Sequence, residues 1–493
     1  MSETKRKKTV AQLLKPSALL ALLALPGISQ AAGTYNGIFT LQPRTTAAGK
    51  QFYLASVPSS YYTHCPAGYN NLPYLMIAPG GYGNFTTDPT GHDNYYTNIT
   101  NTAYALRGKC IRVISIEAPN YSVFDYPETS ALQLPADTVN TDYWANLPPR
   151  RAAAYLRDTI INIQADAAYK FAPRWFLRGG SASSMYAAKL IDVYGTAVAA
   201  GAAGFKYPKT LILESLPSSG NVYNACRYST PNSLVRSIAD TLYQYPFGYP
   251  GVTACQNIIA NPNSHNWKFY NGLGLATYTG LGNNLFIMNG ADDSIYKDNP
   301  SIVGDSWTMD KLLSDFVVNT GKCSGQAFSG SNSIAAVNRD VFFDCDMKTH
   351  VGLYRNGGHG PVSVSSLALD DLVNTAIDPG EVRGIIDPLS GNTINGWACA
   401  YTSRTSISVH LYLGGSAGVG TMVGAYDSNK PSEAAVGTAC SGRGTAYRFS
   451  IPLTLAMRQA YQGKKIYIHA IQPMGTSPNW LVGNSGVYSV PAP

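Results

Sequence analysis

Short apolar runs alternate with segments of helical period over the first three quarters of the chain. The runs are rich in β-branched and aromatic residues, a composition typical of buried strands. They occupy residues 37–43, 50–57, 72–78, 111–118, 174–177, 209–214, 284–289 and 351–355. Helical periods cover residues 150–169, 182–194, 307–318 and 364–377. Strands that alternate with helices predict an α/β domain with a mostly parallel sheet, at residues 34–380.

The pattern changes after the Asp-Pro-Gly sequence that ends at residue 380. Residues 383–493 contain short runs in which apolar and polar residues alternate, separated by Gly, Ser and Pro. The clearest runs are 407–413, 446–451 and 466–471. Alternation with a period of two indicates strands that bury one face. We therefore predict a small all-β sandwich domain at 383–493.

Residues 1–31 have the pattern of a secretory signal peptide. Basic residues at 5–8 precede an apolar run at 17–25, and Ser29-Gln30-Ala31 matches a small-x-small cleavage site. The apolar run is too short to cross a bilayer, which takes about 20 residues. This predicts a secreted or periplasmic protein without a membrane anchor in its mature form. An uncleaved anchor is the alternative.

Composition and charge narrow the class of partner. Hydrophobic residues make up 45% of the chain, so a sizeable core is expected, whereas only 13% of residues are charged. The formal net charge is +7, and removal of residues 1–31, with five Lys or Arg and one Glu, leaves +3. Proteins that read nucleic acid carry clustered basic patches, so no nucleic-acid partner is expected. A chain with little charge and 34 Tyr suits a neutral substrate.

Eight cysteines all follow the predicted signal peptide. An even number in an exported chain predicts disulfides, and the absence of a C-x-x-C pair speaks against a zinc or redox site. Pairing of sequence neighbours gives the bridges Cys65–Cys110, Cys226–Cys255, Cys323–Cys345 and Cys399–Cys440.

The strongest chemical signal surrounds Ser181, where a buried strand meets a tight turn and then a helix. Gly179 and Ser183 stand two residues to either side. A nucleophile elbow needs small residues there, because strand and helix approach closely at a strained turn. The turn places the Ser181 hydroxyl at the helix N-terminus, where the N–H of Ala182 can stabilise an oxyanion. Ser183 replaces the second glycine of G-x-S-x-G, and an ordinary helix-capping loop is the alternative.

A literal G-x-S-x-G at 414–418 lacks the context that the motif needs. It follows a strand but opens no helix, and residues 419–423 have the pattern of a returning hairpin strand. We therefore expect Ser416 to be a turn residue.

Asp293 is the predicted acid. The apolar strand at 284–289 ends in Gly-Ala-Asp-Asp, and a carboxylate just past a strand end can orient an imidazole. Asp293 has the more usual offset than Asp292. The interval after Ser181 leaves room for an inserted cap at roughly residues 215–283.

His359 is the predicted base. The strand at 351–355 is followed by Asn-Gly-Gly-His-Gly, and glycines allow a loop histidine to reach over a nucleophile. The chain order Ser, Asp, His is that of α/β-hydrolases.

A second oxyanion donor is expected in the turn after the strand at 72–78. Pro-Gly-Gly-Tyr-Gly at 79–83 is similar to an HGGG turn in which Pro replaces His. Gly81 or Tyr82 would supply the N–H, and a plain Gly-rich turn is the alternative. No metal and no organic cofactor are implied.

These motifs resemble those of secreted poly(3-hydroxybutyrate) depolymerases and feruloyl or acetylxylan esterases. Gly179-Gly180-Ser181-Ala182-Ser183-Ser184 is similar to their G-L-S-A-G-G-x-M elbow, and Gly357-Gly358-His359 to their histidine loop. The resemblance covers about residues 50–378. It implies an α/β-hydrolase fold and ester hydrolysis through an acyl-enzyme, with Ser181, Asp293 and His359 as nucleophile, acid and base.

The predicted function is that of a secreted serine hydrolase acting on a polymeric or aryl ester, such as a polyhydroxyalkanoate or a plant cell-wall ester. The domain at 383–493 would bind an insoluble polymer or act as a stability cap. A serine peptidase of the same fold is one alternative, although no propeller or large cap precedes Ser181. A non-catalytic polymer-binding protein is the other.

Overall fold

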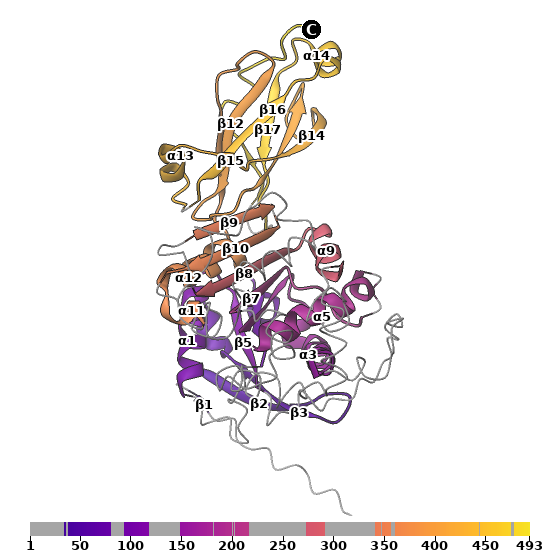
Figure 1. The fold of residues 1–493 in the computed structure, drawn as a ribbon, viewed down its shortest axis with the longest axis vertical. Helices are drawn as coiled ribbons and strands as arrows, with labels where there is room; N and C mark the ends of the chain where they lie inside the picture. The colour runs from indigo at the N-terminus through magenta and orange to yellow at the C-terminus, as the bar shows by residue number, and fades with distance from the viewer. Residues whose placement is uncertain are drawn as a thin grey trace, which may run out of the picture.

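The computed structural model describes most of two domains. The described residues are 34–35, 38–79, 93–117, 148–180, 182–199, 201, 203–215, 273–290, 341–346, 348–355, 360–442, 444–474 and 478–493. Figure 1 shows an α/β domain with an all-β domain at one end, beyond strands β9 and β10. The predicted signal peptide, the predicted helix at 307–318 and most of the predicted cap lie outside the described residues.

Ten strands form one sheet in the order β1-β2-β3-β5-β4-β6-β7-β8-β10-β9. The pairs β5–β4, β4–β6, β6–β7, β7–β8 and β8–β10 are parallel, and the outer pairs are antiparallel. In this order β5 lies between β3 and β4, so that these two strands are exchanged relative to their order in the chain. The same exchange is found in the α/β-hydrolase fold. The strands are β1 (Thr34–Tyr35), β2 (Phe39–Thr45), β3 (Gln51–Ser56), β4 (Tyr74–Ile77), β5 (Arg112–Glu117), β6 (Trp175–Gly180), β7 (Thr210–Glu214), β8 (Asn284–Gly290), β9 (Val341–Asp346) and β10 (Thr349–Tyr354).

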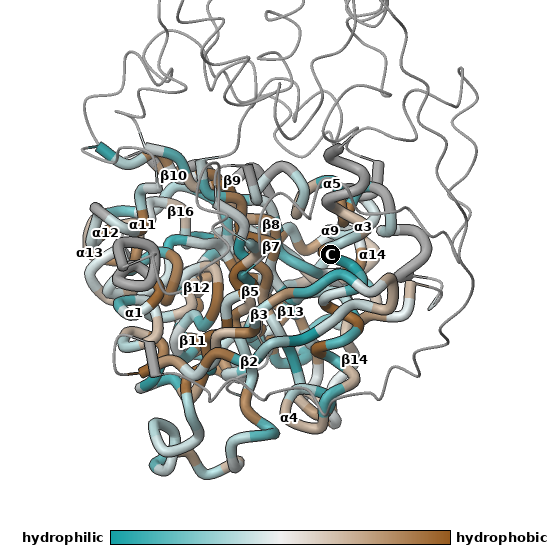
Figure 2. Tube along the Cα trace, turned by 90° about the horizontal axis from the view of Figure 1, so that it is seen from below, coloured by the Kyte–Doolittle hydropathy of each residue, from teal (hydrophilic) through white to brown (hydrophobic). Residues whose placement is uncertain are grey.

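The central strands are buried along their whole length, as expected for a parallel sheet covered on both faces. Every residue of β4, β7, β8 and β10 is buried. The hydrophobic stretches accordingly gather along the central strands around β5 and β7 in Figure 2.

Helices cover both faces of this sheet (Figure 1). On one face α5 (Ala182–Ala199) packs against both α3 (Pro148–Ala165) and α9 (Leu273–Gly280). On the other face, apolar residues of α1 and of the segment 361–377 share a core with β4, β5 and β8. The remaining helical elements are α1 (Asp93–Arg107), α4 (Ala167–Lys170), α11 (Pro361–Val364), α12 (Ser366–Asp371), the π-helix η6 (Leu372–Ile377) and the short 3₁₀ turns Ser59–Tyr62 and Tyr69–Asn71.

Helices α1 and α9 and strand β9 of this domain were not predicted. Helix α1 is rich in Asn and Thr, whose side chains compete for backbone hydrogen bonds, and it is held by the burial of Ile99, Ala103 and Leu106. Strand β9 is an antiparallel edge strand that pairs only with β10 among the described residues. The helix predicted at 364–377 is confirmed over residues 366–377, but its second half is the π-helix η6, which follows α12 directly.

The C-terminal domain is the predicted all-β sandwich. Its two antiparallel sheets have the orders β11-β12-β16-β15 and β14-β13-β17-β18. Inward residues such as Ile394, Leu411 and Ile468 form its core, and outward residues alternate with them. The elements are β11 (Val382–Ile386), β12 (Thr393–Ala400), β13 (Ser408–Leu413), β14 (Thr421–Asp427), β15 (Lys430–Pro431), α13 (Ala434–Ala439), β16 (Ala446–Pro452), α14 (Leu455–Tyr461), β17 (Ile466–Ala470) and β18 (Trp480–Leu481).

Two of the four predicted disulfides are confirmed. Cys65–Cys110 joins the segment after β3 to the start of β5, with a Cα–Cα distance of 5.7 Å. Cys399–Cys440 joins β12 to the end of α13, with a Cα–Cα distance of 6.0 Å. Cys226, Cys255 and Cys323 and the side chain of Cys345 lie outside the described residues, so the other two pairs stay predictions.

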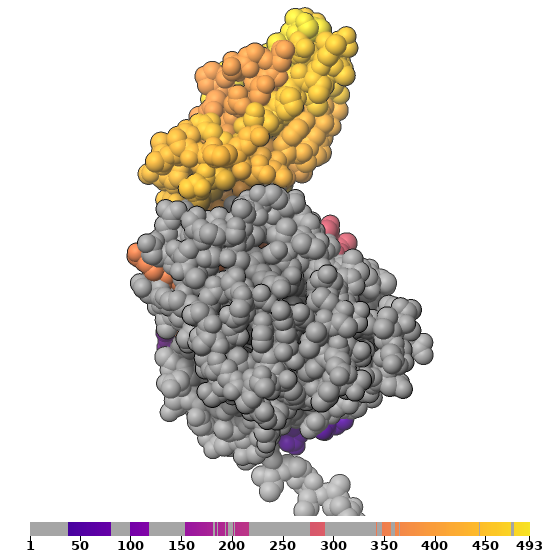
Figure 3. Space-filling view, viewed as in Figure 1, coloured from indigo at the N-terminus to yellow at the C-terminus, as the bar shows by residue number. Residues whose placement is uncertain are grey.

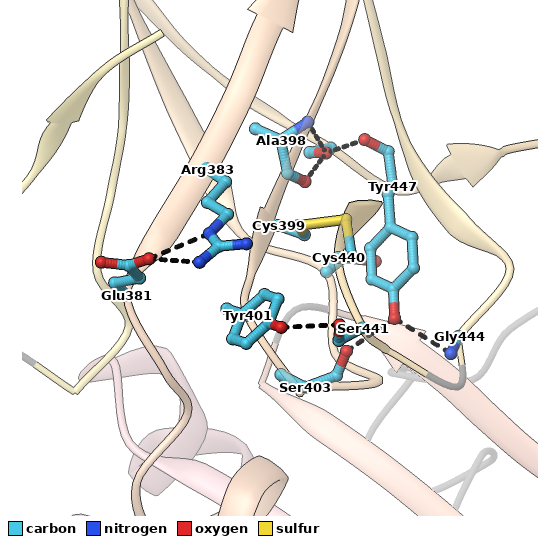
Figure 4. The surroundings of a disulfide bond; sticks show 12 residues. Glu381, Arg383, Ala398, Cys399, Tyr401, Ser403, Cys440, Ser441, Gly444 and Tyr447 are labelled. Carbon is cyan, nitrogen blue, oxygen red and sulfur yellow. Dashed lines mark hydrogen bonds and ion pairs between the residues drawn. A yellow bond between two sulfur atoms is a disulfide. The ribbon is translucent and has the colours of Figure 1, made fainter. Parts of the chain in front are cut away.

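A buried tyrosine closes the loop beside the second disulfide (Figure 4). The Tyr447 hydroxyl donates to the carbonyl oxygen of Ser403 at 2.6 Å and accepts from the Gly444 N–H at 2.9 Å. The ring packs on Cys399 and Cys440. The disulfide is therefore covered by a small apolar cluster separate from the main core of the sandwich.

The two domains are joined by specific contacts, although the C-terminal domain forms a separate lobe in Figure 3. Met474 of the C-terminal domain is 5% exposed and belongs to the core of the α/β domain. Its carbonyl oxygen accepts a hydrogen bond from Arg174 Nη1 at 2.7 Å, and its sulfur one from the Asn284 amide at 3.5 Å. Asp378, in the connection between the domains, pairs with both Arg174 and Lys109.

Of the helices that the structure describes, none combines the length and apolar character of a membrane span.

Candidate active site

Four neighbouring parallel strands end at one edge of the large sheet. In the register, Gly180 at the end of β6 lies opposite Glu214 at the end of β7, and Glu214 lies opposite Met288 in β8. Gly290 at the end of β8 lies opposite Tyr354 at the end of β10. The loops that follow these strands therefore start side by side.

The predicted triad falls on three of these loops. Ser181 follows β6 directly, Asp293 and its neighbour Asp292 follow β8, and His359 follows β10. All four residues lie outside the described residues, as do Gly81 and Tyr82 of the predicted oxyanion loop. Their roles stay predictions, but the described strand ends bring the three loops to one edge of the sheet.

The turn at Ser181 is as short as a strand-to-helix turn can be. Strand β6 ends at Gly180 and helix α5 begins at Ala182, so one residue separates them. A Cβ atom on Gly179 would lie 2.4 Å from the carbonyl oxygen of Ser183 and 2.7 Å from the Cα of Ser184. Real Cβ atoms do not approach that closely, so only glycine fits position 179. Such crowding is expected where strand and helix approach closely, as the predicted nucleophile elbow requires.

Ser183 closes the same turn from the helix side. Its hydroxyl donates to the carbonyl oxygen of Gly180 at 2.8 Å and accepts from the N–H of Gly180 at 2.7 Å. The side chain is 1% exposed. Ser183 therefore stabilises the turn where the related motif has glycine, and its hydroxyl is fully engaged in doing so.

Hydrogen bonds hold Ala78 and Pro79, the two residues that precede the predicted oxyanion loop. The N–H of Ala78 donates to the carbonyl oxygen of Arg178 at 2.8 Å, and the hydroxyl of Tyr186 in α5 donates to the carbonyl oxygen of Pro79. The chain leaving β4 is thus held against both β6 and α5. Pro79, the last described residue before the predicted oxyanion loop, is therefore in contact with helix α5.

An ion pair that the apolar pattern did not reveal lies at this edge. Arg178 Nε donates to Glu214 Oε2 at 2.9 Å, and the two side chains are 8% and 2% exposed. Glu214 Oε1 accepts from the N–H of Val362, and the Ser215 hydroxyl accepts from the N–H of Gly360. A charged residue in each of two otherwise apolar strands was the available sequence signal. Two buried charges in adjacent strands must pair, since an isolated one is costly.

A second carboxylate stands at the carboxyl end of β5. Burial raises the pKa of Glu117 to about 7, although the hydrogen bond from the Ser115 hydroxyl, 2.7 Å long, opposes the rise. Strand β5 lies beside β4, from which the predicted oxyanion loop departs. Glu117 therefore changes charge near neutral pH at the same edge as the predicted triad.

The opposite edge of the sheet holds a cavity of about 940 Å³ at the amino ends of β4 and β6. Tyr74, Tyr169, Trp175 and Phe205 line it. The Trp175 Nε1 donates to the carbonyl oxygen of Lys206, and the Tyr74 hydroxyl accepts from Gln164. The polar atoms of these rings are thus engaged within the protein, and the cavity lies away from the predicted triad.

Among the described residues, one cluster has the composition of a metal site: His64, Cys65 and Cys110. The two sulfurs are bonded to each other, so they offer no thiolate ligands. The literal G-x-S-x-G at 414–418 lies between two strands and opens no helix. Ser416 lies in the β13–β14 hairpin turn, where its carbonyl oxygen accepts from the N–H groups of Val419 and Gly420, as predicted.

No protein-family model matches the sequence. No curated protein is significantly similar to it. Solved structures similar to the chain include an esterase from Pyrococcus furiosus, with 10% identity over 68% of this chain and 88% of that one, at a TM-score of 0.35. Carboxyl esterase 2 from Tuber melanosporum has 13% identity over 71% and 87%, at 0.36. A poly(3-hydroxybutyrate) depolymerase from Bordetella parapertussis has 10% identity over 68% and 88%, at 0.34. Because these identities and TM-scores are low, the assignment of the fold rests on the strand order of the large sheet.

Proposed function

We propose that this protein is a secreted serine hydrolase that cleaves carboxylic esters. The observation that carries the proposal is the turn between β6 and α5, where Gly179 is in contact with Ser183 and one residue, Ser181, joins strand to helix. A serine in such a turn stands at the N-terminus of an 18-residue helix, where the helix dipole favours a developing negative charge. That placement suits nucleophilic attack on a carbonyl.

In the proposed mechanism His359 takes the proton of the Ser181 hydroxyl as the oxygen attacks the ester carbonyl. Asp293 orients the imidazole and stabilises its cation. The N–H of Ala182 and that of Gly81 or Tyr82 bind the oxyanion. The intermediate collapses, the alcohol leaves with the proton from His359, and water repeats the sequence on the acyl-enzyme.

The proposed substrate is a neutral polymeric or aryl ester. The small share of charged residues, 13%, and the abundance of Tyr favour contact with uncharged material. The C-terminal sandwich would raise the local concentration of enzyme on an insoluble polymer by adding a second attachment point. The two disulfides are consistent with folding in an oxidising compartment.

A fluorophosphonate probe and a series of p-nitrophenyl esters test the proposal. We expect Ser181→Ala to lose both labelling and ester hydrolysis, whereas Ser416→Ala, at the matched G-x-S-x-G in the hairpin, keeps both. Peptide mass spectrometry should place the label on Ser181. Hydrolysis that survives in Ser181→Ala would refute the assignment. Labelling at Ser181 with cleavage of peptides and not esters would identify a peptidase instead.

A further inference from the structure

The carboxylate of Glu214 lies between the two loops that carry the predicted nucleophile and base. A Cβ atom on Gly180, the residue before Ser181, would lie 3.8 Å from Glu214 Oε2. One on Gly360, the residue after His359, would lie 3.9 Å from Glu214 Oε1. A single buried side chain at the end of β7 is thus in contact range of the backbone on both sides of the predicted reaction centre.

Both oxygens of this carboxylate have partners within the protein. Oε2 accepts from two nitrogens of the Arg178 guanidinium, which comes from the neighbouring strand β6. Oε1 accepts from the N–H of Val362 at 2.8 Å. Because the pair is almost wholly buried, its geometry is fixed by charge-assisted hydrogen bonds that water does not weaken.

The next residue along the chain adds a second attachment. The hydroxyl of Ser215 accepts from the N–H of Gly360 at 2.9 Å, and its own N–H donates to the carbonyl oxygen of Met288 at 2.8 Å. Ser215 has a positive φ of 49°, which ends β7 and turns its backbone out of the strand. The chain that leaves His359 is therefore bound at 360 and at 362 to the end of β7.

We propose that Arg178, Glu214 and Ser215 form a clamp that holds the loop of His359 at a fixed distance from Ser181. The inference rests on the proposed function, because it assigns the clamp a role in that reaction. The three are positioning residues: their polar atoms are engaged with one another and with backbone N–H groups. The clamp ties the base to β7, the strand next to the one that delivers the nucleophile.

A general base must come within about 2.6–3.2 Å of the hydroxyl that it deprotonates. A displacement of about 1 Å can lower a rate by about 100-fold. On its amino side His359 is preceded by Asn-Gly-Gly, and glycine restrains the backbone least of all residues. The clamp restrains the backbone on the carboxyl side of His359, while Asp293 is proposed to orient the imidazole itself.

Two variants remove the clamp in different ways. Glu214→Gln keeps an oxygen for the Val362 N–H but ends the ion pair with Arg178. Ser215→Gly removes the acceptor for the Gly360 N–H, while glycine adopts the positive φ at this position without backbone strain. The matched control is Asp378→Asn, which breaks a carboxylate pair with Arg174 at the opposite end of β6.

The readouts are kcat and KM on a p-nitrophenyl ester, the pH profile of kcat/KM, and the melting temperature, with active sites counted by complete fluorophosphonate titration. We expect kcat per active site to fall about 10-fold in Ser215→Gly and about 10- to 100-fold in Glu214→Gln, with KM within about twofold. The acidic limb of the profile should move to lower pH, because an imidazole displaced from Asp293 loses its stabilising anion. Asp378→Asn should keep the wild-type kcat and profile.

Unchanged kcat and pH profile per active site in both clamp variants, with Ser181→Ala inactive, would overturn the clamp and leave the proposed function standing. Activity in Ser181→Ala would instead overturn the proposed function. If Glu214→Gln were as inactive as His359→Ala while Asp293→Asn stayed active, Glu214 would be the acid of the triad, and the positioning role would be wrong.

Discussion

The two ends of strand β6 carry the same chemistry and serve different purposes. At the amino end Arg174 pairs with Asp378, and the side chains are 16% and 15% exposed. At the carboxyl end Arg178 pairs with Glu214, and the side chains are 8% and 2% exposed. The first pair joins the start of β6 to the connection between the two domains, and the second joins strands to the segment after the predicted base.

The difference lies in what each pair can tolerate. The partly exposed pair is screened by water, and Asp378 keeps a second partner in Lys109, so loss of one contact is compensated. The buried pair has no such reserve, because a lone charge left in its place would be neither solvated nor paired. The pair at the amino end of β6 is thus adjustable, whereas the pair at its carboxyl end is a rigid element beside the predicted site.

The largest effect is expected when the two arginines are replaced in parallel. Arg178→Met should lower the free energy of unfolding by about 3–5 kcal/mol, because Glu214 remains buried without its cation. Arg174→Met should cost only about 1 kcal/mol. Urea denaturation of the two variants measures both values, and equal losses would erase the contrast between the two ends of β6.

A smaller effect is expected from crowding at the carboxyl end. Gly179→Ala places a Cβ atom 2.4 Å from the Ser183 carbonyl oxygen, so it should cost about 3 kcal/mol and distort the turn at Ser181. A Cβ atom on Gly180 would lie 3.8 Å from Glu214 Oε2, an ordinary van der Waals distance, so Gly180→Ala is the matched control. Thermal unfolding of the two variants tests this. A Gly179→Ala protein as stable as the control would mean that the turn is looser than described.

The smallest effect is expected at Glu117 and depends on pH. The folded protein holds this proton up to about pH 7 and the unfolded chain releases it near 4.5, so stability falls as the pH rises between these values. Glu117→Gln should therefore be more stable than the wild type by about 2–3 kcal/mol above pH 7 and equal to it below pH 4.5. Denaturation at pH 4, 6 and 8 measures the difference, and a constant offset across that range would contradict it.

The parallel sheet could be predicted from the sequence because its strands are continuous apolar runs between turn residues. Six central strands, the sandwich and two disulfides follow from that pattern and from cysteine spacing. Helix α1 could not be found, since its Asn- and Thr-rich sequence becomes helical only when Ile99 and Leu106 pack on the sheet. The π-helix η6 could not be distinguished from an α-helix, because the apolar period of a segment does not reveal a change in its hydrogen-bond register.

The turn at Ser181 could be predicted because its requirement is local: small residues beside a strand end. The clamp could not, because Arg178, Glu214 and Gly360 are far apart in sequence and meet only through the strand order. An arginine or glutamate in an apolar strand indicates that it has a buried partner but does not identify that partner. The register of β6 on β7 identifies it.

Met474 constrains the order in which the two domains can be completed during synthesis. This side chain, which fills part of the α/β core, is synthesised 300 residues after Arg174, whose side chain donates a hydrogen bond to the Met474 carbonyl oxygen. Translation proceeds from the N-terminus at about 5–20 residues per second, so the α/β core stays incomplete until the C-terminal sandwich has almost wholly emerged. A chain cut before Met474 would expose an apolar socket. The α/β domain is therefore not complete before the C-terminal sandwich is, and the two domains reach maturity together.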